Sequence, residues 1–173
     1  MNLLRWLVVI LSIFLAVILQ PILLTRLNFP GATVDLILVL ICAWAIAKGP
    51  IVGASAGFIA GLLIDLTPPT EPIMGLNSFS LVLIGFVVGL LGVKPSKSFF
   101  RPLLIVAFAS VVLIMLNAAL TSIFESPVAF SRVSELLFTQ AIYTSLLAVF
   151  VLPLVTWLDR KLGPTSRADE LRL

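Results

Sequence analysis

Apolar residues run along this chain in long stretches that are separated by short segments rich in proline, glycine and charge. A helix needs about 20 apolar residues to cross a bilayer. The pattern therefore predicts six transmembrane helices, near residues 3–25, 33–48, 50–66, 73–93, 99–124 and 136–158. Stop signals lie between them, at Phe29-Pro30-Gly31, Thr67-Pro68-Pro69, Lys94-Pro95-Ser96 and Glu125-Ser126-Pro127.

The second and third segments could form one long helix, but Lys48-Gly49-Pro50 stands between them. Proline is favourable at the first position of a new helix, whereas inside a helix it removes a hydrogen bond and clashes with the preceding turn. We therefore expect two short helices joined by a tight hairpin. They are about 24–26 Å long, which is short for a hydrocarbon core of about 30 Å.

Composition agrees with a membrane protein, because 61% of the 173 residues are hydrophobic and only 11% are charged. We expect an all-α integral membrane protein with six transmembrane helices in one bundle, over residues 1–160, and a short cytoplasmic tail at 161–173. The chain has no histidine and one cysteine, Cys42, inside an apolar run. An internal disulfide is therefore impossible, a zinc site is not expected, and Cys42 reads as a small buried residue.

The basic residues are distributed unequally between the two predicted sides of the membrane. Nine of the eleven fall on the side of the two termini, and only Arg26 and Arg132 fall on the other. By the positive-inside rule, both termini are predicted to be cytoplasmic. The three tryptophans, Trp6, Trp44 and Trp157, all fall near the inner interface, as expected for an aromatic belt.

The third segment carries glycines at every fourth position, which places them on one helix face that ends at Asp65. Small residues allow two transmembrane helices to approach closely. We predict that this stripe, together with a second small-residue pair in the fourth segment, packs against another helix of the chain or against a partner. The residues are Gly49, Gly53, Gly57 and Gly61, with Gly85 and Gly89.

Polar residues inside the predicted helices fall at outer-leaflet depth. Some are explained as ordinary helix-end residues, Asp35 above all, since a carboxylate in the first turn is stabilised by the helix dipole. Asn117 lies several residues inside its span. We therefore predict an outer polar cluster that holds helices together or contacts a ligand, formed by Gln20, Asp35, Asp65, Asn77, Asn117, Gln140 and Tyr143.

Catalysis is not expected from this sequence. It has no histidine, no nucleophile beside a base, no metal-ligand spacing and no phosphate-binding GxxxxGK[ST] motif. We expect no catalytic residue, no cofactor and no metal. A proton relay through Asp35 and Asp65 is the remaining chemical alternative, although no charged residue continues it towards the inner side.

The segment from Val34 to Gly89 resembles the rod shape-determining protein MreD family. The resemblance is carried by an Asp before an apolar span, the Lys-Gly-Pro at 48–50, the GxxxGxxxG helix, Leu-Asp-Leu before two prolines, and a Gly-Leu that opens the next span ahead of GxxxG. It covers about a third of the chain, and the six-span pattern extends it to the full length.

This resemblance implies a non-enzymatic membrane subunit of the bacterial cell-elongation machinery. Such a subunit binds the single-span, largely extracytoplasmic MreC and helps organise peptidoglycan synthesis and cell shape. It works beside the actin-like MreB, the RodA glycosyltransferase and a class B penicillin-binding protein. Nucleic acid is not an expected partner.

The family fold is similar to that of the S-components of energy-coupling factor transporters, which gives an alternative function. An S-component binds a vitamin near the outer surface, and the outer polar cluster would then be its ligand site. Partners distinguish the two: a coupling subunit and two ATPases would accompany an S-component, whereas MreC would accompany a shape-determining protein.

Overall fold

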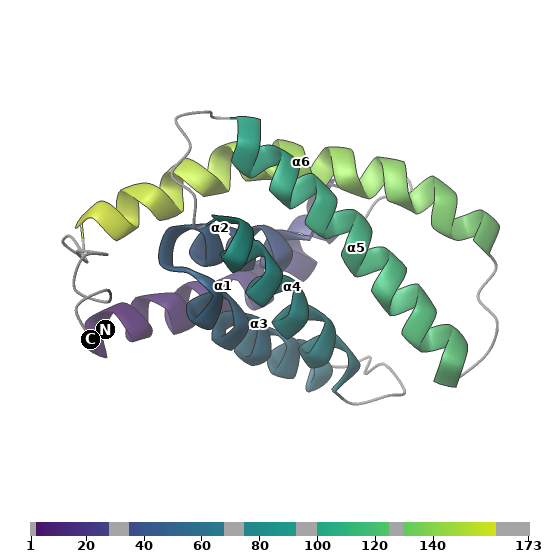
Figure 1. Ribbon diagram of the computed structural model, residues 1–173, viewed down its shortest axis with the longest axis horizontal. Coiled ribbons are helices and arrows are strands. Elements are labelled where there is room, and N and C mark those ends of the chain that lie inside the picture. Colours follow the sequence, from purple (N-terminus) through teal and green to yellow (C-terminus); the bar gives the residue numbers. More distant parts are fainter. Residues whose placement is uncertain (1–2, 28–34, 68–74, 93–99, 125–129, 162–173) are drawn as a thin grey trace.

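The computed structural model describes residues 3–27, 35–67, 75–92, 100–124 and 130–161, and this part of the chain is helical apart from short turns. Each of the six predicted segments corresponds to one helix (Figure 1). The helices are α1 (Leu3–Leu27), α2 (Leu36–Lys48), α3 (Pro50–Asp65), α4 (Leu76–Gly92), α5 (Phe100–Phe124) and α6 (Phe130–Lys161). The main difference from the sequence prediction is that α6 begins at Phe130 rather than near 136.

The break between the second and third predicted segments is confirmed. Gly49 has a φ of 98°, a left-handed conformation that glycine adopts without steric cost, and its N–H donates to Ala45 O at 2.8 Å. Pro50 then stands at the first position of α3, where its missing N–H removes no helical hydrogen bond. One charged residue, one glycine and one proline thus reverse the chain direction between α2 and α3.

The short helix α2 forms the centre of the bundle. Residues 37–45 are all buried, and α2 contacts each of the other helices. A helix that is apolar on every face can be enclosed by other helices or face lipid, because it has no side suited to water. The sequence LILVLICAWAIAK has this character, and in the structure the other helices enclose it.

Trp44 is part of this core and not of an interfacial belt. Its side chain is only 1% exposed, and its Nε1–H donates to Ser12 Oγ of α1 at 3.1 Å. Ser12 Oγ in turn donates to Val9 O at 2.7 Å. The expectation that Trp44 lies in an aromatic belt is therefore wrong, because the depth of a residue along a helix does not tell which way its side chain points. Trp157, in contrast, is 55% exposed.

The outer surfaces of the other helices are strongly apolar. Large hydrophobic side chains are exposed on α1, α3, α4, α5 and α6, for example Leu11, Phe58, Phe79, Leu104 and Phe150. Two stretches, Phe100–Leu120 in α5 and Gln140–Asp159 in α6, are long and apolar enough to cross a membrane by length and composition. The apolar parts of the other four helices are shorter.

The beginning of α1 and the end of α6 lie at the same end of the molecule, on the left of Figure 1. At the Lys48 end of α2, Lys48 Nζ forms an ion pair with Asp159 on α6. Lys48 is nearly buried in this pair, with a side-chain exposure of 5%. The pair therefore joins the central helix to the last helix of the bundle.

Candidate functional site

The predicted glycine stripe lies between α3 and α4 of the same chain. Gly53, Gly57 and Gly61 face the backbone of α4 so closely that a methyl group on any of them would overlap main-chain atoms. At Gly57 such a methyl would stand 2.6 Å from the carbonyl carbon of Leu81, and at Gly61 it would stand 2.5 Å from the amide nitrogen of Ser78. The two helices are therefore in direct backbone contact along this face.

Glycines of α4 complete the contact from the other side. A methyl on Gly85 would lie 2.6 Å from the carbonyl carbon of Gly53, and one on Gly89 would lie 2.6 Å from Pro50 N. A methyl on a further glycine, Gly92, would lie 2.8 Å from Cα of Ile46 on α2. The sequence interpretation missed Gly92, although it follows Gly89 by three residues and so lies close to the same helix face.

Gly49 has a different role from the other glycines of the stripe. It precedes α3, and a methyl group added to it would meet no other atom within 4 Å. Its positive φ makes it a turn residue, as described above. Gly49 is therefore required for the reversal between α2 and α3, and the close contact of α3 with α4 begins beside it at Pro50, which faces Gly89.

Asp65 stands at the end of the glycine face, four residues after Gly61, and its carboxylate caps the start of α4. Its Oδ2 accepts from Gly75 N at 3.1 Å, from Ser78 N at 3.3 Å and from Ser78 Oγ at 2.8 Å. Its Oδ1 accepts from Asn77 Nδ2 at 3.0 Å. The first N–H groups of a helix have no partner within the helix, and a negative charge there also interacts favourably with the helix dipole. Asp65 is only 3% exposed, so this capping takes place away from solvent.

The start of α2 is capped in a similar way by two residues from different helices. Asp35 Oδ1 accepts from Leu38 N at 2.9 Å, which is the usual side-chain bond of an N-cap residue. Gln20 of α1 reaches across and accepts from Ile37 N with its Oε1 at 3.2 Å. Two adjacent N–H groups of α2 are thus satisfied by side chains, and one of these bonds also fastens α1 to α2.

The remaining polar residues lie on α5 and α6. Asn117 Oδ1 accepts from Ser80 Oγ at 2.7 Å, which links α5 to α4. Gln140 is 9% exposed and Tyr143 is partly exposed, both on α6. Of the seven predicted residues, the structure brings Asp65 and Asn77 together at α4, and Gln20 and Asp35 together at α2. Gln20, Asp35, Asp65, Asn77 and Asn117 thus bind groups of this chain in ways that fasten or cap its helices.

These contacts are structural in their chemistry. Asp35 and Asp65 act as hydrogen-bond acceptors for helix starts, and within the described residues no three Asp, Glu, Cys or His side chains gather in the manner of a metal site. Cys42 is buried in α2 as a free thiol. Ser78 and Ser80 were missed from the sequence, because a serine in an apolar helix carries no signal until its neighbours are known.

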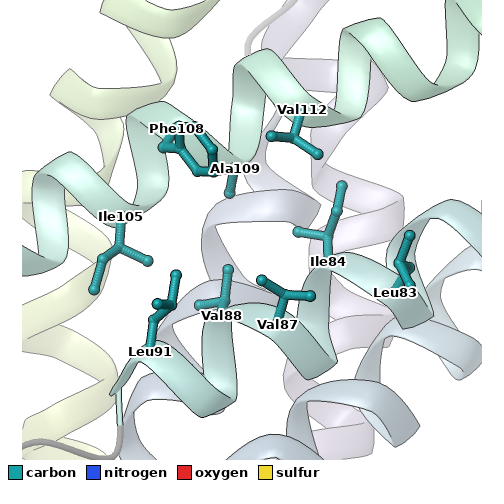
Figure 2. Close-up of a pocket in the computed structure, with 9 residues that line it drawn as sticks. All are labelled: Leu83, Ile84, Val87, Val88, Leu91, Ile105, Phe108, Ala109 and Val112. Carbon is teal, nitrogen blue, oxygen red and sulfur yellow. The ribbon is translucent and has the colours of Figure 1, made fainter.

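An apolar groove lies between α4 and α5, with a volume of about 60 Å³ (Figure 2). Its floor consists of Ile84, Val88 and Ala109, and exposed side chains such as Val87 and Phe108 form its rim. At the end marked by Leu91, the guanidinium of Arg101 donates from Nη2 to Leu91 O at 3.1 Å. A cation therefore stands at the C-terminal end of α4, where it interacts favourably with the helix dipole.

Replacing Gly57 by alanine tests the backbone contact. The added methyl meets the main chain of α4, which cannot rotate aside, so we expect the free energy of unfolding to fall by about 3 kcal/mol. Phe58→Ala is the matched control, because the neighbouring side chain is 53% exposed and should be nearly neutral. Thermal unfolding of the two purified variants in the same detergent would measure the difference. Equal stability would contradict direct contact at Gly57.

The two carboxylates should respond differently to asparagine. Asp65 uses both oxygens as acceptors, so Asp65→Asn replaces one acceptor by a donor and is expected to cost about 1–3 kcal/mol. The N-cap bond from Leu38 N to Asp35 Oδ1 is one that asparagine can also accept, so Asp35→Asn should cost less than about 0.5 kcal/mol. Thermal unfolding of both variants would show whether this order holds, and a larger loss for Asp35→Asn would overturn it.

Comparison with known families gives one match that spans nearly the whole chain. The model of the family described as rod shape-determining protein MreD matches residues 1–162. Comparisons with curated proteins and with solved structures found no match. With all but the last residues covered by that one family model, the chain belongs to the MreD family of rod shape-determining proteins.

Proposed function

We propose that this protein is a non-enzymatic subunit of the bacterial cell-elongation machinery that spans the inner membrane, binds MreC and helps organise peptidoglycan synthesis. The observation that carries the proposal is the MreD family match over residues 1–162, which supports a role in rod shape determination. The geometry adds what such a subunit needs, which is a stable bundle with an apolar outer surface.

The membrane topology in this proposal has six spans. Exposed apolar side chains on five helices suit contact with lipid, and the central helix α2 can be short because its neighbours enclose it. Glycine contacts make α3 antiparallel to α4, since Gly53 faces Gly85 and Gly61 faces Ser78. Nine of the eleven basic residues then lie on the cytoplasmic side together with both termini.

Labelling of single cysteines tests this topology. In a Cys42→Ser background, cysteines at Thr70 and Ser126 should react with a membrane-impermeant reagent in intact cells, whereas cysteines at Ser96 and Ser166 should react only after lysis. All four positions lie outside the described residues and within predicted connections or the tail. Labelling of Ser166 from outside would reject the proposed orientation.

MreC binding is proposed to use the apolar exterior. The glycine face of α3 is occupied by α4, so a partner helix has to pack elsewhere on the bundle. Five of the predicted polar residues are engaged in helix contacts of this chain, which favours a partner that offers an apolar transmembrane segment over a small polar ligand. MreB, RodA and a class B penicillin-binding protein are proposed as further members of the same assembly.

The competing interpretation is a vitamin-binding S-component. It would use the outer polar residues to hold a ligand, but in the structure Asp35 and Asp65 hold helix starts and Asn117 holds Ser80. These bonds favour the shape-determining function. The likeness of the six-helix fold to S-components stays a prediction.

Co-purification from gently solubilised native membranes tests the function. Full-length MreC should remain with the tagged protein, and MreC without its transmembrane segment should be lost, because the contact is proposed to lie within the membrane. Mass spectrometry of the purified material would identify the proteins and small molecules that remain. Recovery of two ATPases with a vitamin-like ligand, and no MreC, would contradict the proposal in favour of the transporter subunit.

A further inference from the structure

The groove between α4 and α5 has a closed floor and an open mouth (Figure 2). Ile84, Val88 and Ala109 at the floor are each 3% exposed. Val87 and Phe108 at the mouth are 40% and 62% exposed. The small side chain of Ala109 and the open mouth leave apolar space beside Val88 that an acyl chain can contact.

Apolar lining alone does not make this groove selective for a ligand inside a membrane. Lipid tails are as apolar as the side chains of the groove, so no hydrophobic driving force favours one apolar occupant over another. Selectivity requires a polar or charged contact at one end of the groove.

Arg101 provides such a contact. Its Nη2 donates to Leu91 O at 3.1 Å, and Leu91 stands opposite Ile105 at one end of the groove in Figure 2. In the topology proposed above, this end lies at the cytoplasmic interface, at the level of the lipid phosphates. A guanidinium carries five N–H donors in a planar fork, a geometry that suits phosphate oxygens as well as a backbone carbonyl.

We propose that the groove and Arg101 together bind an anionic phospholipid of the inner leaflet. One acyl chain lies along Val88 and Ala109, and the phosphate contacts the guanidinium of Arg101. A zwitterionic lipid brings a fixed positive charge beside the same phosphate, so the site prefers the anionic headgroup. The proposal rests on the membrane topology proposed above and does not depend on MreC binding.

Lipid retention by the full-length protein tests the site. The protein is purified in detergent, incubated with equal amounts of phosphatidylglycerol and phosphatidylcholine that carry the same acyl chains, and examined by native mass spectrometry. A basic residue near a membrane surface contributes about 1 kcal/mol to anionic lipid binding, so we expect about fivefold more retained phosphatidylglycerol than phosphatidylcholine. Arg101→Gln should abolish this preference. Lys161→Gln, which removes a cation at the end of α6, should leave it unchanged.

A second pair of variants tests the groove itself. Val87→Trp places a large side chain at the mouth and should reduce retention of both lipids severalfold. Leu90→Trp is the matched control, because Leu90 is 52% exposed on α4 and lies outside the groove. Both positions are exposed, so neither variant should prevent folding.

Three results would overturn the proposal: a fivefold preference that survives Arg101→Gln, an equal loss of preference in Lys161→Gln, or equal lipid retention by the two tryptophan variants. MreC co-purification, measured on the same variants, separates the two proposals. Loss of the lipid site with MreC still bound would leave the proposed function intact. If the wild-type protein retains the lipid but does not co-purify MreC, the proposed function is rejected and the lipid site remains supported.

Discussion

The direct backbone contact between α3 and α4 is the constraint on which the rest of the bundle depends. With glycine on both sides of the contact, at Gly53 and Gly85, the two helices pack without intervening side chains. The same closeness lets the carboxylate of Asp65 reach Gly75 N, just before α4, and Ser78 N in its first turn. The small-residue face and the carboxylate at its end therefore act together: the glycines set the distance between the helices, and Asp65 fixes their register.

Helix starts impose the second constraint. In a low-dielectric surrounding an unsatisfied N–H group costs several kcal/mol, because water is not available to replace the missing partner. The chain meets this need with side chains from neighbouring helices, so Gln20 of α1 serves α2 and Asp65 of α3 serves α4. At the opposite end of α4, Arg101 of α5 binds the carbonyl of Leu91. Each of these bonds satisfies a helix terminus and also joins two helices.

Much of this architecture could be predicted from the sequence. The helices, and the break at Gly49, follow from hydrophobic length and from proline and glycine positions, which are local properties. The four-residue spacing of the glycines identified the face of α3 that packs closely. It could not identify the helix that packs against this face, because the sequence of one helix does not specify its neighbour. Trp44 was misplaced because α2 is apolar all round and its sequence does not favour any rotation. The sequence grouped the outer polar residues by depth along the helices, whereas their hydrogen-bond partners depend on helix rotation, which periodicity leaves undetermined.

The glycine contact also limits how this protein can change during evolution. When two helices pack through side chains, an enlarged residue on one can be compensated by a smaller residue on the other. At Gly57 and Gly61 the facing atoms belong to the main chain of Leu81 and Ser78, which every amino acid shares. No substitution at the facing position can restore the lost space there. Compensation would require the two helices to cross differently. We therefore expect fewer substitutions to be accepted during evolution at Gly57 and Gly61 than at the buried positions of α2.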